Sequence, residues 1–132
     1  MVALTEPVIR LIRHPHTSKV LATVSPGGEP HMIVCGSLSI IEPDTIVVGE
    51  VYMHRTSEYL HNDPRVEFLV WSGKSGYSIK AIAKERLVDG PVFDKMAATL
   101  ERLNMTVVAV WTFEALEVWD ESASDSAGDR VI

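Results

Sequence analysis

Six short runs of β-branched and apolar residues, each bounded by turn-forming residues, constrain the fold of this chain more than any other feature. They span residues 19–24, 32–41, 45–49, 65–71, 77–88 and 107–119. No strand–helix–strand repeat links them, which argues against a parallel sheet and for a small antiparallel barrel or sandwich. Closing the sheet is the economical choice, because a closed sheet leaves no exposed edges. We therefore expect a mainly β fold with six strands.

Three segments carry the signals of short helices. Thr5 can cap the first, with Pro7 in its first turn. The second is a brief helix that we expect Thr56 to cap and that ends before Pro64, because the residue preceding a proline avoids helical angles. The third begins at Pro91, where apolar residues recur at helical spacing. Two or three short helices should therefore accompany the strands.

The chain of 132 residues has the length of one domain, which we place at residues 1–119. Residues 120–132 are acidic and rich in serine, and we expect this tail to be flexible and to lie outside the fold. No apolar run approaches the ~20 residues of a membrane span, so no membrane partner is expected. The first residues lack a secretory signal, which predicts a cytoplasmic protein.

The net charge is −6, which opposes general binding to nucleic acid. Any anion must therefore be bound locally. The best candidate is the segment from Met53 to Ser57, where a helix start offers free N–H groups beside the side chains of His54, Arg55 and Thr56. That combination suits a phosphate group. On this segment alone, an ordinary capped helix with a solvated arginine is the better explanation.

A second group of cations lies further along the chain. Strand alternation in the run 77–88 predicts that Lys80, Lys84 and Arg86 share one face. A flexible loop before this run, from Ser72 to Gly76, contributes Lys74. Lys80 and Lys74 could complete a phosphate pocket, and solvated strand charges explain the pattern equally well.

Other kinds of chemistry find little support. Cys35 is the lone cysteine and falls in an apolar strand, so it has neither a disulfide partner nor the setting of a nucleophile. His14 and His16 flank a proline with no carboxylate or cysteine at ligand spacing, and we predict no metal site. No catalytic residue is identified from the sequence.

Five motifs, in this order, give the region from Val20 to Val118 a resemblance to the FMN-binding split-barrel family, the pyridoxamine 5'-phosphate oxidase-like flavoproteins, and especially to its short single-domain members. The motifs are Ala22-Thr23-Val24 followed by a glycine turn and Pro30-His31; Ile46-Val47-Val48; Met53-His54-Arg55-Thr56; Asn62-Asp63-Pro64-Arg65-Val66; and Asp89-Gly90-Pro91 with Phe93.

The resemblance implies a six-stranded antiparallel split β-barrel of Greek-key type and a homodimer with FMN in a groove between the subunits. It further implies that Arg55 and Thr56, with His54, hold the phosphate of FMN. Lys80 matches a basic position of the family that often reaches the same phosphate.

The same resemblance predicts what flanks the rest of the cofactor. The segments Val34-Cys35-Gly36-Ser37 and Gly49-Glu50-Val51 should lie against the flavin ring through backbone groups, and the loop with Lys74 and Ser75 should close over the ribityl chain. If the Glu50 carboxylate lies near the pyrimidine side of the flavin, its charge should lower the reduction potential.

The activity implied is that of an oxidoreductase, a flavin reductase, an oxidase or an electron carrier, with its donor and acceptor open. The substrate-binding signatures of true pyridoxamine 5'-phosphate oxidases are not visible in residues 111–120, so that activity is not expected. One alternative is a non-enzymatic module that binds or stores haem or a deazaflavin. Another is a purely structural dimer.

Overall fold

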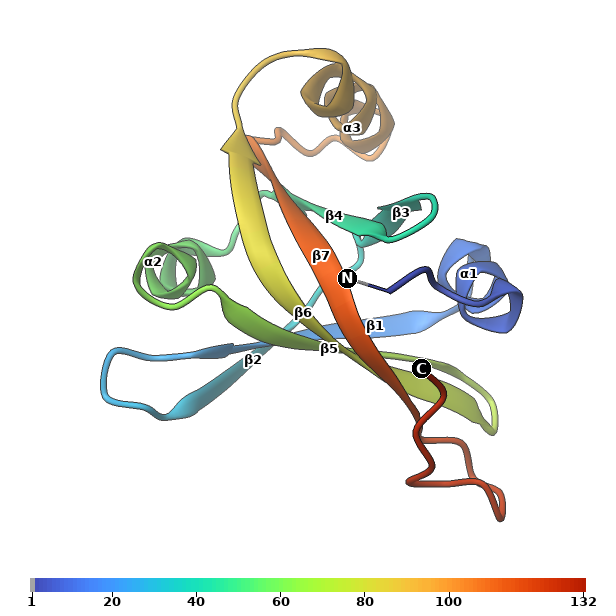
Figure 1. Ribbon diagram of the computed structural model, residues 1–132. Helices are drawn as coiled ribbons and strands as arrows, with labels where there is room; N and C mark the ends of the chain where they lie inside the picture. The colour runs from blue at the N-terminus through green and yellow to red at the C-terminus, as the bar shows by residue number, and fades with distance from the viewer. Residues whose placement is uncertain (1) are drawn as a thin grey trace.

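A computed structural model describes residues 2–132 (Figure 1). Its helices are α1 (Glu6–Arg13), α2 (His54–Asn62) and α3 (Pro91–Glu101). Its strands are β1 (Ser18–Val24), β2 (Pro30–Val34), β3 (Ser39–Ile41), β4 (Thr45–Glu50), β5 (Arg65–Ser72), β6 (Ser75–Leu87) and β7 (Ala109–Asp120). Figure 1 shows α1 and α2 on opposite sides of the strands, with α3 beyond β4.

The seven strands form one antiparallel sheet in the order β2-β1-β5-β6-β7-β4-β3. The mainly β prediction is confirmed, but the expected closed barrel of six strands is wrong, since β2 and β3 remain as the two edges. The extra strand arises because residues 32–41 do not form one strand. Gly36 and Ser37 form a turn there, closed by a hydrogen bond of 3.2 Å from Leu38 N to Cys35 O. This turn carries the chain from one edge strand to the other.

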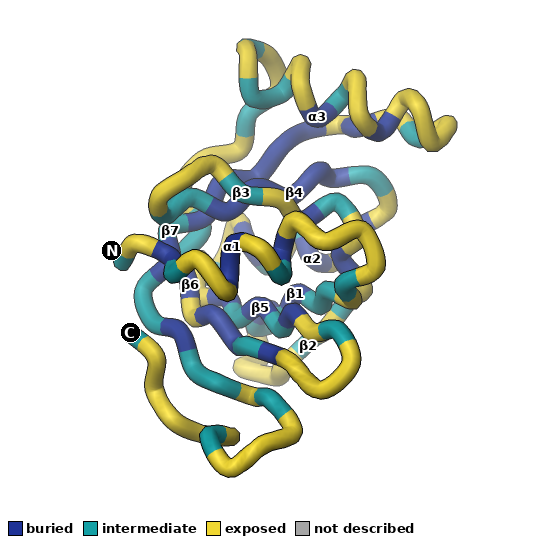
Figure 2. Tube along the Cα trace, turned by 90° about the vertical axis from the view of Figure 1, so that its right-hand side faces the viewer, coloured by how far each residue is buried: buried dark blue, intermediate teal, exposed yellow. Residues whose placement is uncertain are grey.

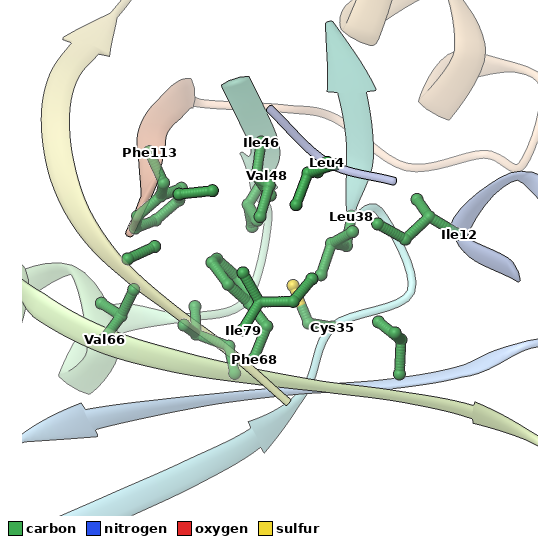
Figure 3. Packing of buried hydrophobic residues seen from close by; sticks show 14 of the residues in the cluster. Leu4, Ile12, Cys35, Leu38, Ile46, Val48, Val66, Phe68, Ile79 and Phe113 are labelled. Carbon is green, nitrogen blue, oxygen red and sulfur yellow. The ribbon is translucent and has the colours of Figure 1, made fainter. Parts of the chain in front are cut away.

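The main core fills the concave side of the sheet (Figure 3). Phe68 of β5 and Phe113 of β7 meet edge to face with their ring centroids 5.0 Å apart. Ile12 of α1 is buried against the same cluster and is labelled in Figure 3. Figure 2 shows buried and exposed positions alternating along α1. Burying side chains of this size contributes about 1.5–3 kcal/mol each to folding.

The helices follow their local signals with one exception. α1 begins after Thr5 with a proline in its first turn, as predicted. In α2 the N-cap position belongs to Met53, so the prediction that Thr56 caps this helix is wrong. The helix begins earlier because the strand before it ends at Glu50, and Thr56 is then buried against the sheet. In α3, Met96 and Leu100 pack in a second apolar cluster with Val47 and Val110.

The segment from Ser72 to Gly76 is a tight hairpin turn. The ladder between β5 and β6 continues to the pair Ser72 and Ser75, which leaves only Gly73 and Lys74 in the turn. Gly73 has a φ of 57°, a conformation that glycine adopts without strain. The expected five-residue flexible loop is therefore wrong, because strand pairing absorbs all but two of its residues.

The residues after β7 fold back along the sheet. Val118 N donates to Ile132 O at 3.0 Å, and Asp120 N donates to Asp129 O at 2.8 Å. Ser122 Oγ accepts a hydrogen bond of 3.0 Å from Gly76 N. The structure thus places residues 121–132 against β6 and β7, whereas their composition suggested a segment apart from the fold. Their flexibility and the domain boundary at residue 119 stay predictions. Among residues 2–132, no helix combines the length and the apolar character needed to span a bilayer.

Candidate functional site

A groove of about 360 Å³ runs between the turn after β2, the end of β4 and the end of α3. Six residues that the sequence analysis selected contribute to its wall: Val34, Cys35, Gly36, Ser37, Gly49 and Val51. Most of the remaining lining is apolar and includes Met53, Leu103 and Met105. The structure therefore brings together the segments 34–37 and 49–51, which begin fifteen residues apart in the sequence.

Hydrogen bonds of Ser37 fix the wall of the groove. Its hydroxyl accepts from Gly49 N at 2.9 Å and donates to Gly49 O at 3.2 Å. At Gly49 the backbone also approaches α3 closely, since a Cβ atom there would lie 2.9 Å from Leu100 Cδ1. The absence of a side chain at Gly49 thus allows α3 to border the groove.

The start of α2 follows the groove directly, after Met53. No side chain caps this helix, and the first intrahelical bond of its N-terminal turn runs from Ser57 N to Met53 O, so the N–H groups of the preceding residues lack intrahelical acceptors. Arg55 is exposed, and its guanidinium lies 3.4 Å from Tyr59 Oη through both Nε and Nη2. Among residues 2–132 no carboxylate pairs with Arg55. Its charge is therefore available to an anion at the helix start.

Within residues 2–132, three buried polar atoms on β1, β2 and α2 have no hydrogen-bond partner: Thr23 Oγ1, His31 Nε2 and Thr56 Oγ1. Thr23 and His31 are cross-strand neighbours on β1 and β2. The His31 ring meets Tyr59 of α2 edge to face at 5.2 Å. Because buried polar atoms without partners are rare, each of these atoms marks a place for a water molecule or a ligand oxygen.

Burial, with a further contribution from the nearby charge of Arg55, lowers the pKa of His31. The imidazole is therefore neutral at physiological pH and can donate or accept through Nε2. Sequence reasoning had used His31 only as part of a family motif and had not assigned Thr23 or His31 to the site. The signal that was available was the position of Pro30-His31 after a glycine turn.

Glu50 lies at the end of β4, between Gly49 and Val51 of the groove wall, but its side chain does not line the groove. Its carboxylate is held by Arg86 of β6, Trp111 of β7 and Ser57 of α2. These partners occupy the carboxylate, and Glu50 is absent from the groove lining, whereas Gly49 and Val51 contribute to it.

Arg86 reaches Glu50 because of a β-bulge. The register between β6 and β7 shifts between Ala83 and Glu85, so Ala83 pairs with Phe113 while Arg86 pairs with Trp111. Phe113 and Trp111 share one face of β7, and Arg86 therefore lies on the core face. The prediction that Arg86 shares a face with Lys80 and Lys84 is wrong, since strict alternation ends at the bulge.

The remaining selected residues lie elsewhere in the chain. Lys80 is exposed in the middle of β6, with Glu67 and Glu117 as its cross-strand neighbours, and lines a separate cavity. Lys74 lies in the β5–β6 turn, and Ser75 lines a third cavity beside α1. Within one chain these three residues do not join the groove. Among residues 2–132 no group of three or more potential metal ligands comes together.

The Cys35 thiol borders the groove but is shielded from solvent. Burial raises its pKa to about 12, despite the opposing effect of the Lys19 ammonium. The thiol therefore stays protonated and does not act as a nucleophile. The geometry thus provides a mainly apolar groove whose lining includes Met53, and the start of α2 with the exposed Arg55 follows Met53 directly. Such a site can take a planar ring system with an anionic group at one end.

Comparison with known proteins gives a match to one family model and to solved structures, but none to a curated protein. The family model described as pyridoxamine 5'-phosphate oxidase matches residues 5–120.

Solved structures with the same fold include an FMN-binding protein from Syntrophomonas wolfei, with a TM-score of 0.80 and 21% identity over 88% of this chain and 84% of that one. Group A Streptococcus HupZ has a TM-score of 0.81 and 17% identity, over 95% and 99% of the two chains. HutZ, the heme storage protein from Vibrio cholerae, has a TM-score of 0.68 and 13% identity, over 92% and 97%. At such identities these likenesses establish the fold.

Proposed function

The chain belongs to the pyridoxamine 5'-phosphate oxidase family, and from this premise we propose that it binds FMN in the groove and acts as an FMN-dependent oxidoreductase in the form of a homodimer. One observation carries the proposal: the start of α2 has no side-chain cap, and within residues 2–132 the buried Thr56 Oγ1 lacks a hydrogen-bond partner and Arg55 lacks a carboxylate partner. A phosphate group would accept hydrogen bonds from the helix start and from Arg55.

The phosphate end of FMN fits the start of α2. The free N–H groups and the positive end of the helix dipole attract a dianion, and the Arg55 guanidinium adds charged hydrogen bonds. Thr56 Oγ1, in the first turn of the helix, and His31 Nε2, whose ring contacts Tyr59 later in the helix, would be further donors. The phosphate role that the sequence suggested for Arg55 and Thr56 is thus supported by unsatisfied hydrogen-bonding groups.

The ring end of FMN fits the groove. Its apolar lining suits a flat aromatic system. FMN supplies the transfer of a hydride or of electrons when bound. The residues of this chain anchor the phosphate, orient the ring and limit the access of water to it.

A second copy of the chain is the expected cover of the groove. Val34 and Tyr52 are each 84% exposed, Met32 is 69% exposed and Leu103 is 63% exposed, and three of these four side chains line the groove. Apolar side chains gathered around a binding site at such exposure are typical of an interface. A homodimer would bury them and enclose the cofactor.

A haem-binding module is the second candidate. Two methionines, Met53 and Met105, line the groove, and thioether sulfur is a known axial ligand of haem iron. The structural neighbour HutZ is a heme storage protein. The unsatisfied donors at the start of α2 favour FMN, since haem carries carboxylates and no phosphate.

The test is an absorption spectrum of the purified protein before and after addition of FMN, followed by a titration of binding. Flavin bands with tight FMN binding support the proposal, and haem bands support the alternative. Arg55→Ala should weaken FMN binding by at least about tenfold, or ~1.5 kcal/mol, through the loss of charged hydrogen bonds. Arg10→Ala, on the distant helix α1, is the matched control. A colourless protein that does not bind added FMN contradicts the proposal.

A further inference from the structure

Glu50 makes a dense set of contacts for a residue at the end of a strand. Only 9% of it is exposed, and its carboxylate accepts hydrogen bonds from three different elements. Oε1 accepts from Trp111 Nε1 at 2.8 Å, from Ser57 Oγ at 2.7 Å and from Arg86 Nε at 3.2 Å, and Oε2 accepts from Arg86 Nη2 at 2.9 Å. Such a carboxylate is both neutralised and fixed in direction.

Of these hydrogen bonds, the one from Ser57 connects Glu50 to α2. Ser57 lies in the first turns of this helix, two residues after Arg55. Among residues 2–132, its bond to Glu50 is the one side-chain hydrogen bond between α2 and the sheet. Ring contacts of Tyr59 with His31 and of His61 with Trp111 hold the later part of the helix. The start of the helix, which lacks a side-chain cap, is therefore tethered to the sheet through Glu50.

The charge of Glu50 would by itself disturb a phosphate site. A carboxylate beside a helix start competes with an anionic ligand for the positive potential there. Arg86 removes this conflict, because its guanidinium forms an ion pair with Glu50 at 2.9 Å. The tether thus reaches the helix start without adding a net negative charge to it, and the bulge at Lys84 is what makes the pairing possible.

From these contacts we infer that Glu50 is a positioning residue for the phosphate end of the cofactor: through Ser57 it holds the first turn of α2, and hence Arg55 and the free N–H groups, in the orientation that binds the phosphate. The inference rests on the proposed function. It assigns to the Glu50 side chain a role apart from the flavin ring, next to which the family resemblance had placed this segment.

The decisive measurement compares FMN with riboflavin, which lacks the phosphate. Ser57→Ala leaves Glu50, Arg86 and Trp111 paired and suits a helix, because alanine has the highest helix propensity. It should weaken FMN binding by about tenfold, the equivalent of one hydrogen bond to a charged group, and leave riboflavin binding unchanged. Ser57→Thr keeps the hydroxyl and should restore most of the preference for FMN.

Two further variants complete the design. Glu50→Ala should lose the preference for FMN as well, and adding Ser57→Ala to it should cause no further loss, since both changes remove the same tether. Lys84→Met breaks the ion pair with Glu114 between β6 and β7 and should leave both affinities unchanged. Urea unfolding without flavin verifies that each variant is folded. If Glu50→Ala fails to fold, the comparison of Ser57→Ala with Ser57→Thr still decides.

Each outcome has one meaning. A wild-type protein that binds riboflavin as tightly as FMN contradicts the proposed phosphate site itself. A wild-type protein that prefers FMN, with a Ser57→Ala variant that keeps this preference within about twofold, overturns the positioning role while the proposed function stands. Equal losses for FMN and riboflavin also overturn it, because they indicate a general effect on the groove.

Discussion

The Arg86 guanidinium and the Glu50 carboxylate form an ion pair, with Nη2 and Oε2 2.9 Å apart, at the place where β4, β6 and β7 meet α2; the carboxylate is buried and the arginine partly exposed. The two residues are 36 positions apart in the sequence. A bulge in β6 turns Arg86 toward the core face, and without it the arginine side chain would lie on the opposite face of the sheet.

Removing Arg86 should therefore destabilise the protein. Arg86→Met leaves the Glu50 carboxylate buried without its counter-ion, which costs 3–5 kcal/mol at fully buried sites. Arg86 is partly exposed, so we expect a loss of about 2 kcal/mol in the free energy of unfolding, measured by urea denaturation. Lys84→Met removes the exposed partner of the ion pair between Lys84 on β6 and Glu114 on β7 and should change this free energy by less than ~0.5 kcal/mol. Equal effects of the two substitutions would show that the Glu50–Arg86 pair contributes no more to the free energy of unfolding than an exposed ion pair does.

The same pair predicts how stability depends on pH. Burial alone raises the pKa of Glu50, but hydrogen bonds from Arg86, Ser57 and Trp111 outweigh it and hold the pKa at about 2, below its usual value of 4.5. A carboxyl whose pKa is lower in the folded state stabilises the protein above the unfolded pKa, and this contribution is lost as the pH falls. We expect wild type to exceed Glu50→Gln in the free energy of unfolding at pH 6–7, with the difference shrinking between pH 4.5 and pH 2. Urea unfolding across this pH range measures the difference in free energy. A difference that does not change with pH would contradict the lowered pKa of Glu50 in the folded protein.

Much of the fold was predictable from local patterns. Runs of β-branched residues and helix-start signals located most strands and all three helices, because those signals depend on neighbouring residues. The split of residues 32–41 into two strands was missed, since the break at Gly36 and Ser37 is fixed by hydrogen bonds from Ser37 to Gly49, a residue on another strand. Closure of the sheet was mispredicted for a similar reason, because it depends on how far the edge strands approach each other.

Parts of the candidate site could be predicted from the sequence. Features that depend on neighbouring residues were predicted, whereas those that depend on contacts between distant strands were not. The helix start at Arg55 carries its own local signal, and the groove wall came from a family resemblance. The Glu50–Arg86 pair could not be predicted, because a bulge changes which residues share a face and leaves no clear mark in the sequence. The role of His31 was missed because its unsatisfied Nε2 is defined by packing against α2.

Gly49 should tolerate no side chain without a response from α3. An added Cβ would lie 2.9 Å from Leu100 Cδ1 and 3.1 Å from Met96 Cγ, both in a buried cluster. Gly49→Ala should cost about 1–2 kcal/mol in the free energy of unfolding because the cluster becomes overpacked. In a Leu100→Ala background the methyl group fills part of the space left by leucine, so the same change should cost less. Additive costs in this double-mutant cycle would exclude a direct clash.

Cys35 should be protected from thiol reagents in the folded protein. It is buried, and its pKa of about 12 leaves almost no thiolate at pH 8. Labelling with a chromogenic disulfide reagent at pH 8 should be slow in buffer and rapid in denaturing urea, where the thiol regains its ordinary pKa. Rapid labelling of the native protein would show that this side of the groove opens, and the expected water exclusion from the ring would then fail.

The proposed homodimer makes Val34 the most informative surface residue. Its side chain is 84% exposed and belongs to the groove wall, so a charge there would face both the second copy and the cofactor. Val34→Lys should shift the protein from dimer to monomer in sedimentation velocity and weaken FMN binding by at least about tenfold, because burying an unpaired ammonium is unfavourable. Val88→Lys, at a position that is 56% exposed and outside the groove lining, controls for the added charge and should change neither property. A Val34→Lys variant that remains dimeric and binds FMN as wild type does would place the interface on another face of the sheet.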